Sequence, residues 1–214
     1  VFKWTSSSWC EDQDFFRFSG IYRDVYLYAI PEVHVQDLKV QTLLDDSFTN
    51  AELDITLKAT KGGRVRVTLS KDGEKLQTLE EALEEISHYV MKVAAPKLWS
   101  AETPELYDLL IEVTDENGAL KEVIPQRVGF RRFEMKGNIM TLNGRRIVFK
   151  GVNRHEFSSV TGRCVSREEL VKDIVTMKQN NINAIRTCHY PDAEGIYDLC
   201  DEYGLYMIAQ CNME

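Results

Sequence analysis

The sequence lacks any apolar run long enough to cross a bilayer, and it has no leader-like segment at its start. It is also short of basic residues: 26 lysines and arginines stand against 34 aspartates and glutamates, giving a formal net charge of -8. Nucleic acid and anionic membranes are therefore disfavoured as partners, because both would repel the chain. The hydrophobic content of 43% is typical of a soluble globular protein with an ordinary core.

Closely spaced cysteine pairs of the C-x-x-C type are missing as well. The chain has five cysteines: Cys10, Cys164, Cys188, Cys200 and Cys211. An odd number without a compact framework favours free thiols, so we expect a reducing compartment, namely the cytoplasm. A metal site made of Cys188, His189, Cys200 and Cys211 is a weaker alternative, because the ligand spacing typical of zinc is absent.

Neither end of the sequence has the features of a domain boundary. Val1-Phe2-Lys3-Trp4 begins as if within a strand, and Glu214 comes soon after an apolar strand with no closing helix. We therefore expect the 214 residues to be a piece of a longer protein. Near the start, Ile21 to Tyr28 alternates with a period of two, which predicts a strand.

Strand signals continue from Val33 to about Val128. Apolar and polar residues alternate from Val33 to Val40, with a slip near Asp37 that indicates a β-bulge. Turn sequences separate the later apolar runs: Lys61-Gly62-Gly63, Lys71-Asp72-Gly73-Glu74 and Asp115-Glu116-Asn117-Gly118. Short strands at this spacing predict a β-sandwich of about a hundred residues. The acidic run Glu80 to Glu85 indicates a solvent-exposed face, with a helical turn as the alternative.

The pattern changes in the last third of the chain. Asn143-Gly144 predicts a tight hairpin, and Ile147-Val148-Phe149 predicts the strand that follows it. Ser166-Arg167-Glu168-Glu169 is a capping box that begins a helix. A strand at Asn183 to Arg186, a helix from Pro191 to Gly204 and a strand at Leu205 to Ile208 come next. This alternation predicts the first three parallel β/α units of a (β/α)8 barrel.

Polar side chains follow each predicted parallel strand: Asn153, Arg154, His155 and Glu156 after the first, Arg186, His189 and Tyr190 at the second, Asn212 and Glu214 after the third. Active sites of such barrels lie at the carboxyl ends of the strands, so we expect one site there. For Arg154 and Glu156 an ion pair with each other at the rim is an equally good interpretation.

Motifs along the whole chain resemble those of glycoside hydrolase family 2, in particular its β-galactosidases. The first part carries Glu11-Asp12-Gln13-Asp14, Arg17, Ser19-Gly20-Ile21 and Arg23-Asp24-Val25. The middle carries Pro96-Lys97-Leu98-Trp99-Ser100, Leu106-Tyr107 and Val128-Gly129-Phe130-Arg131. The last part carries Gly151-Val152-Asn153-Arg154-His155-Glu156, Met177-Lys178-Gln179-Asn180-Asn181, His189-Tyr190-Pro191 and Cys200-Asp201-Glu202-Tyr203-Gly204. Their order matches that of the family.

The resemblance implies three parts: residues 1–30 as the last strands of a jelly-roll sugar-binding domain, 31–129 as an immunoglobulin-like sandwich, and 130–214 as the start of a TIM-barrel catalytic domain. It implies a retaining β-galactosidase, which hydrolyses terminal β-D-galactosyl residues through a glycosyl-enzyme. The family's acid/base and nucleophile glutamates lie later in the barrel than Glu214. The chain by itself is therefore expected to be inactive.

The resemblance also implies roles for five residues. Asp14 matches an aspartate that binds galactosyl hydroxyls and helps to hold sodium, and Glu214 matches a carboxylate ligand of magnesium. His155 and His189 match histidines that contact the sugar and stabilise the transition state. Arg186 matches an arginine beside the catalytic carboxylates. The substrate implied is a galactoside.

Two departures and two alternatives accompany the resemblance. Ala209-Gln210 stands where the family usually has an Asp-Glu pair, which leaves support of the magnesium open, and Phe157-Ser158-Ser159 replaces a His-x-Pro sequence.

β-Glucuronidase and β-mannosidase share the architecture, but Asn153-Arg154-His155-Glu156 and the acidic segment around Asp14 favour galactose. The other class is a non-catalytic β-sandwich scaffold or interaction module, self-associating through the open edge of a truncated barrel.

Overall fold

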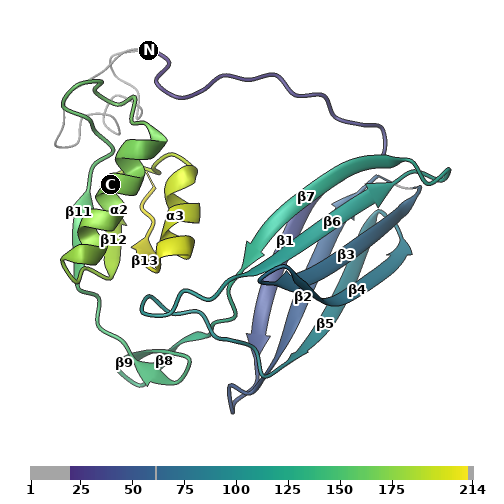
Figure 1. Cartoon of the computed structure of the whole chain (residues 1–214), viewed down its shortest axis with the longest axis horizontal. Helices are drawn as coiled ribbons and strands as arrows, with labels where there is room; N and C mark the ends of the chain where they lie inside the picture. The colour runs from purple at the N-terminus through teal and green to yellow at the C-terminus, as the bar shows by residue number, and fades with distance from the viewer. Residues whose placement is uncertain (1–19, 61, 212–214) are drawn as a thin grey trace. The chain divides into compact units, whose positions relative to one another are not determined.

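A computed structural model describes residues 20–60 and 62–211 of the chain (Figure 1). Asp14 and Glu214 therefore lie outside the described residues, as does the acidic segment beginning at Glu11. The chain divides into two compact units. One comprises Leu27–Ile147, and the other combines Val148–Glu214 with the residues up to Tyr26.

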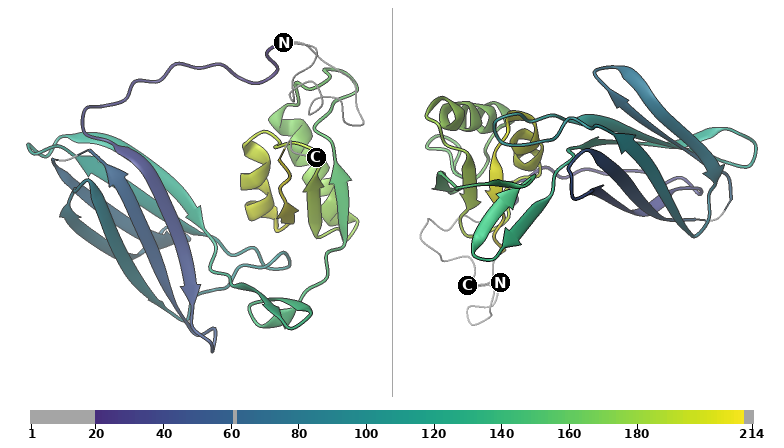
Figure 2. Two further views of the ribbon diagram at one scale, coloured as in Figure 1. Left: turned by 180° about the vertical axis from the view of Figure 1, so that it is seen from behind. Right: turned by 90° about the horizontal axis from the view of Figure 1, so that it is seen from below.

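Two antiparallel sheets form the core of the first unit (Figure 2). One has the order β1-β2-β5, with bounds Val35–Leu44, Asn50–Ala59 and Ile86–Ala94. The other has the order β4-β3-β6-β7, with bounds Glu74–Ala82, Arg64–Lys71, Tyr107–Thr114 and Leu120–Val128. The predicted sandwich is thus confirmed. The pairing of β1 with β2 shifts register between Val35 and Asp37, which is the predicted bulge.

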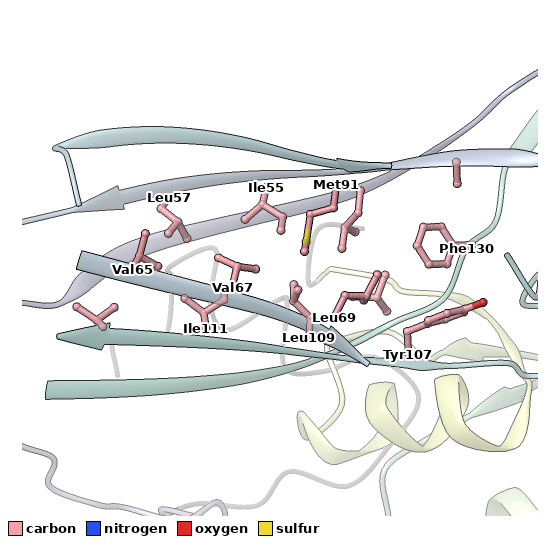
Figure 3. Close-up of a cluster of buried hydrophobic side chains, with 14 of the residues drawn as sticks. Ile55, Leu57, Val65, Val67, Leu69, Met91, Tyr107, Leu109, Ile111 and Phe130 are labelled. Atoms are coloured by element: carbon pink, nitrogen blue, oxygen red, sulfur yellow. The ribbon is translucent and has the colours of Figure 1, made fainter. Parts of the chain in front are cut away.

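Alternate side chains of both sheets point toward one another and fill the sandwich (Figure 3). Fully buried members include Ile55 and Leu57 of β2, Val67 of β3, Met91 of β5 and Ile111 of β6. Burying each such aliphatic side chain contributes about 1.5–3 kcal/mol relative to leaving it in water. The period of two in the sequence therefore predicts the interior correctly.

The acidic run Glu80 to Glu85 is exposed apart from Leu83, as predicted; its first half ends strand β4 and its second half is not helical, so the helical-turn alternative is wrong. β4 is an edge strand whose side chains are almost all exposed, and it carries no apolar alternation to mark it. Arg64 Nε and Arg66 Nη2 each lie 3.1 Å from a carboxylate oxygen of Glu80. These cross-strand pairs and the ladder with β3 hold the edge in place.

Four motif residues of the middle segment meet at one end of the sandwich. The Trp99 N–H donates to the Phe130 carbonyl at 2.9 Å. A Cβ at Gly129 would lie 2.9 Å from the Cβ of Trp99, so the indole can pack here only because residue 129 has no side chain. Phe130 in turn meets Tyr107 edge to face, with ring centroids 4.9 Å apart.

A small hairpin sheet completes the first unit. It consists of β8 (Phe133–Lys136), β9 (Ile139–Leu142) and β10 (Arg145–Arg146). Asn143 and Gly144, with φ of 50° and 76°, form the predicted tight turn. β8 was not anticipated from the sequence.

The second unit contains the predicted β/α alternation. Parallel strands β11 (Gly151–Arg154), β12 (Ala184–Thr187) and β13 (Tyr206–Ile208) form a sheet, with helices α2 (Arg167–Gln179) and α3 (Gly195–Tyr203) between them. The two helices pack against each other on the same side of the strands (Figure 2). Buried side chains of the two helices form one core with Ile185 of β12 and with Leu205, which precedes β13; the helical members include Leu170, Ile174, Ile196 and Leu199.

The capping box of α2 is confirmed. The Glu169 N–H donates to Ser166 Oγ at 3.3 Å, and the Ser166 N–H donates to Glu169 Oε2 at 2.9 Å. The predicted terminator of α3 is also confirmed, because Gly204 takes a left-handed φ of 77°.

Three local predictions are wrong. The strand expected at 147–149 forms at Gly151–Arg154, where Gly151 pairs with Ala184. The helix expected from Pro191 begins at Gly195, because Asp192 is buried against Arg154 and is not part of a first turn. The strand expected from Ile21 to Tyr28 is not formed, and most of these side chains are exposed.

In the described part of the chain, no helix is long and apolar enough to cross a membrane.

Candidate functional site

The carboxyl ends of β11 and β12 bring the two predicted histidines together. The strands pair in parallel with Arg154 opposite Thr187, so the residues that follow each strand lie side by side. The rings of His155 and His189 are 5.7 Å apart between centroids and inclined at 80°. Both residues are half-buried.

Arg186 and the end of β13 join the same cluster. Arg186 Nη2 lies 3.5 Å from His189 Nδ1, and Gln210 Oε1 lies 3.1 Å from the same nitrogen. The Gln210 N–H donates to Thr187 Oγ1 at 2.8 Å, which fixes the glutamine beside β12. In the sequence, Gln210 is marked only by standing where the family usually has an acidic residue. The structure shows that its side chain contacts His189.

Arg154 is a buried ion-pairing group behind this cluster. Its Nε and Nη2 donate to Asp173 Oδ2 at 3.0 and 2.9 Å, and its Nη1 donates to Asp192 Oδ2 at 2.8 Å. Burial opposes the charge, but the two carboxylates outweigh it and raise the pKa of Arg154 above its usual value.

Asp192 is almost completely buried, with 2% of its surface exposed. Only Oδ2 receives a hydrogen bond in the described structure, whereas Oδ1 is buried without one. Burial therefore raises the pKa of Asp192 to about 6, although Arg154 acts in the opposite direction.

Glu156 is equally buried, with 1% of its surface exposed, and both of its carboxylate oxygens are bonded. Oε1 accepts from the Ala193 N–H at 2.6 Å, and Oε2 accepts from Arg23 Nη2 at 2.9 Å. Arg154 and Glu156 thus have separate partners, and the rim ion pair between them is not formed. Asp173, Asp192 and Arg23 were missed in the sequence, because nothing local marks partners so distant along the chain.

A polar pocket of about 370 Å³ opens beside Glu156. Tyr22, Arg23, Arg163 and Glu194 are among its lining residues. The Arg163 guanidinium stacks over Tyr22 at 4.1 Å and over Tyr190 at 4.5 Å from the ring centroids. The N-terminal segment thereby contributes side chains to the surroundings of the histidine cluster.

The described residues do not form a metal site on their own. No group of three or more histidine, cysteine, aspartate or glutamate side chains within 20–60 and 62–211 is arranged to hold an ion. The four cysteines described in these ranges are free, and burial raises the pKa of Cys200 to about 12, which disfavours the thiolate that a metal requires. Asp14 and Glu214, the expected ligands, lie outside the described residues.

Three models of one family match the chain. The sugar binding domain of glycosyl hydrolases family 2 matches residues 1–31, the family 2 model itself matches 33–131, and the family 2 TIM barrel domain matches 133–214.

Curated relatives and solved structures agree with these matches. Aligned over its whole length, the chain is 51% identical to the β-galactosidase of Halalkalibacterium halodurans and covers 22% of that protein. It is 50% identical to the β-galactosidase of Streptococcus thermophilus and covers 21% of that one. In structure it resembles β-glucuronidase 3 of Bacteroides uniformis, with a TM-score of 0.78 and 27% identity over 84% of this chain and 23% of that one. The chain spans about a fifth of the two curated relatives. It belongs to glycoside hydrolase family 2.

Proposed function

We propose that the full-length protein containing this chain is a retaining β-galactosidase that hydrolyses terminal β-D-galactosyl residues. The observation that carries the proposal is the convergence of His155, His189 and Arg186 at the ends of two adjacent barrel strands. Its support is the similarity of the whole chain to proteins named β-galactosidase. The alternative substrate is a β-glucuronide, but the structural likeness to β-glucuronidase 3 reflects only the family that both proteins share.

The two imidazoles bind sugar hydroxyls in this proposal. A neutral imidazole offers one N–H donor and one acceptor nitrogen, a pair that matches a hydroxyl group. Held half-buried at strand ends, His155 and His189 need little reorganisation when the oxocarbenium-like transition state forms. Arg186 supplies positive charge beside His189, which stabilises an anionic carboxylate at the reacting centre.

The residues that perform the covalent chemistry belong to later barrel strands. Retaining hydrolysis requires two carboxyl groups roughly 5 to 5.5 Å apart across the scissile bond. The chain therefore provides one wall of the sugar site, and we propose that Asp14 contributes a further contact to galactosyl hydroxyls. Carboxylates of Glu214 and Asp14 would hold magnesium and sodium, as their hard oxygen ligands suit these ions. These ions would supply only electrostatic stabilisation to the part of the sugar site that this chain forms.

The test compares two proteins and two substrates. The full-length protein is expected to hydrolyse a nitrophenyl β-D-galactoside and to release galactose first as the β-anomer, seen by NMR. The corresponding β-D-glucuronide should be turned over far more slowly. The 214-residue chain alone should hydrolyse neither. Preference for the glucuronide, or turnover by the chain alone, contradicts the proposal.

Two further properties belong to the proposal. The free state of Cys164, Cys188, Cys200 and Cys211 supports a reducing compartment such as the cytoplasm. In the described residues β11 and β13 are the two edges of the parallel sheet, and open edges favour pairing with another chain. We expect the 214-residue chain alone to self-associate. A concentration-independent monomer in sedimentation would contradict this.

A further inference from the structure

The residues on either side of His155 both reach the loop that carries His189. Glu156 binds the distal end of this loop, because its Oε1 accepts from the Ala193 N–H at 2.6 Å. Its own N–H donates to the Tyr190 hydroxyl oxygen at 3.1 Å, directly beside His189. One buried residue adjacent to the first histidine thus holds two points around the second.

Arg154 holds a further point of the same loop. Its Nη1 donates to Asp192 Oδ2 at 2.8 Å, and both groups are buried. The loop 189–193 is therefore tied at residues 190, 192 and 193 to the segment 154–156. These bonds leave little freedom for the ring of His189 to shift relative to the ring of His155.

Arg23 adds a tie from the opposite end of the chain. Its Nη2 donates to Glu156 Oε2 at 2.9 Å and to the Pro191 carbonyl at 2.8 Å. A guanidinium can make both bonds at once because its donors are fixed in a plane. Arg23 therefore closes a bridge between Glu156 and the loop, and it neutralises a carboxylate that is too deeply buried to be left alone.

We propose that Glu156, fixed by Arg23, is a positioning residue that sets the relative placement of His155 and His189. The proposal rests on the proposed function, because the placement matters for catalysis only if the two imidazoles bind the sugar. It assigns Glu156 no contact with substrate. A purely structural role would be different: it would lower the stability of the unit while leaving the two imidazoles of the folded molecules unchanged.

The test uses the full-length protein with Glu156→Gln. Glutamine keeps the volume but has only one acceptor oxygen, so its NH₂ group must face either the Ala193 N–H or Arg23. We expect kcat per active site for a β-galactoside to fall at least about ten-fold with KM within about three-fold, as expected when transition-state contacts are lost. The control is Glu80→Gln, which removes a carboxylate bonded to two arginines in the sandwich. Its kcat should stay within about two-fold.

A second readout requires no substrate. Deuterium exchange at the imidazole C2 hydrogen, followed by mass spectrometry, reports the environment of each histidine in the folded protein. With Glu156→Gln the exchange rates at His155 and His189 should change at least about two-fold, because their placement sets their environment. His34 and His88, which lie in the sandwich unit, serve as internal references and should not change.

The outcomes separate the two proposals. If the unaltered full-length protein hydrolyses no galactoside, the proposed function fails, and the exchange rates still decide whether Glu156 positions the histidines. If Glu156→Gln lowers only the thermal midpoint, with kcat per active site and both exchange rates unchanged, the positioning role is overturned. A loss of kcat without a change at either histidine overturns it as well.

Arg23→Gln keeps the proposal testable if Glu156→Gln does not fold. Arg23 is partly exposed, with 41% of its side chain accessible, so its replacement is less damaging to folding. It should produce the same pattern of kcat and histidine exchange. Where Glu156→Gln folds, its effect and that of Arg23→Gln should add to less than their sum in the double variant, because both changes remove the same ion pair between Arg23 and Glu156. Full additivity contradicts the bridge.

Discussion

His155 and His189 stand with their ring centroids 5.7 Å apart and their planes inclined at 80°, each just beyond the end of a parallel strand. The two rings therefore meet edge to face and are not stacked. Because the strands are neighbours in one sheet, the separation of the rings is set by backbone pairing and by the ties that hold the loop after β12.

The first prediction concerns these imidazoles. His155→Phe and His189→Phe in the full-length protein keep a ring in place but remove the polar nitrogens. We expect kcat/KM for a β-galactoside to fall by about 10²–10³-fold for each, because a preorganised donor aimed at the transition state is lost. Steady-state kinetics with active-site titration measure this. His88→Phe, an exchange on the exposed face of β5, is the control and should change little. Native-like kinetics of either site variant would contradict the assignment.

The second prediction concerns pH and Asp192. Its pKa is raised from 3.8 to about 6 in the folded chain, so the folded state retains the proton over a range in which the unfolded state has lost it. The stabilisation from this group is complete below pH about 4 and is lost as the pH rises through about 6. Asp192→Asn removes the titrating group, so this contribution to the pH dependence of stability disappears.

Urea unfolding of the native chain and of Asp192→Asn, measured from pH 4 to pH 7, checks the sign. The free energy of unfolding of the variant minus that of the native chain should increase with pH, by up to about 3 kcal/mol for a shift of this size. The measurement compares the two proteins at each pH, so titration of other carboxylates cancels. A difference that is flat, or that falls with pH, would show that Asp192 has no raised pKa.

The third prediction concerns the start of α2. Ser166→Ala removes the hydroxyl that accepts from the Glu169 N–H, and it should lower the stability of the helix by about 1 kcal/mol. Amide hydrogen exchange of residues 167–179 reports this locally. Ser159→Ala, an exposed serine in the preceding loop, is the matched control and should leave the exchange of these amides unaltered. Equal protection of these amides from exchange in the two variants would contradict the prediction.

The fourth prediction compares two glycines with positive φ in the sandwich. Gly63 and Gly73 have φ of 97° and 81°, so alanine costs about 1–2 kcal/mol at either from backbone strain alone. A Cβ at Gly63 would also lie 2.0 Å from the Thr114 carbonyl oxygen, whereas a Cβ at Gly73 has nothing within 4 Å. Gly63→Ala should therefore be the more destabilising by at least about 1–3 kcal/mol, because backbone must shift. Urea unfolding followed by circular dichroism tests it. Equal midpoints would mean that the close approach does not exist.

The sequence by itself determined the local elements and their order. Alternation along β2 and β3, the turn at Asn143-Gly144 and the capping box at Ser166 depend on residues within a few positions of one another. Their backbone preferences act without help from distant parts of the chain, so they can be read from neighbours alone. The placement of two histidines and an arginine at strand ends followed from the same local order.

Only the tertiary structure decided the partners of those residues. β4 escaped notice because an edge strand exposed on both faces needs no apolar alternation. The bond between Arg23 and Glu156 joins residues 133 positions apart, and the pair of Arg154 with Asp192 spans 38. Such pairs depend on where the chain returns in space, because a buried charge takes whichever counter-charge the packing brings within reach. The sequence therefore placed the imidazoles at the site, and the fold determined what holds them there.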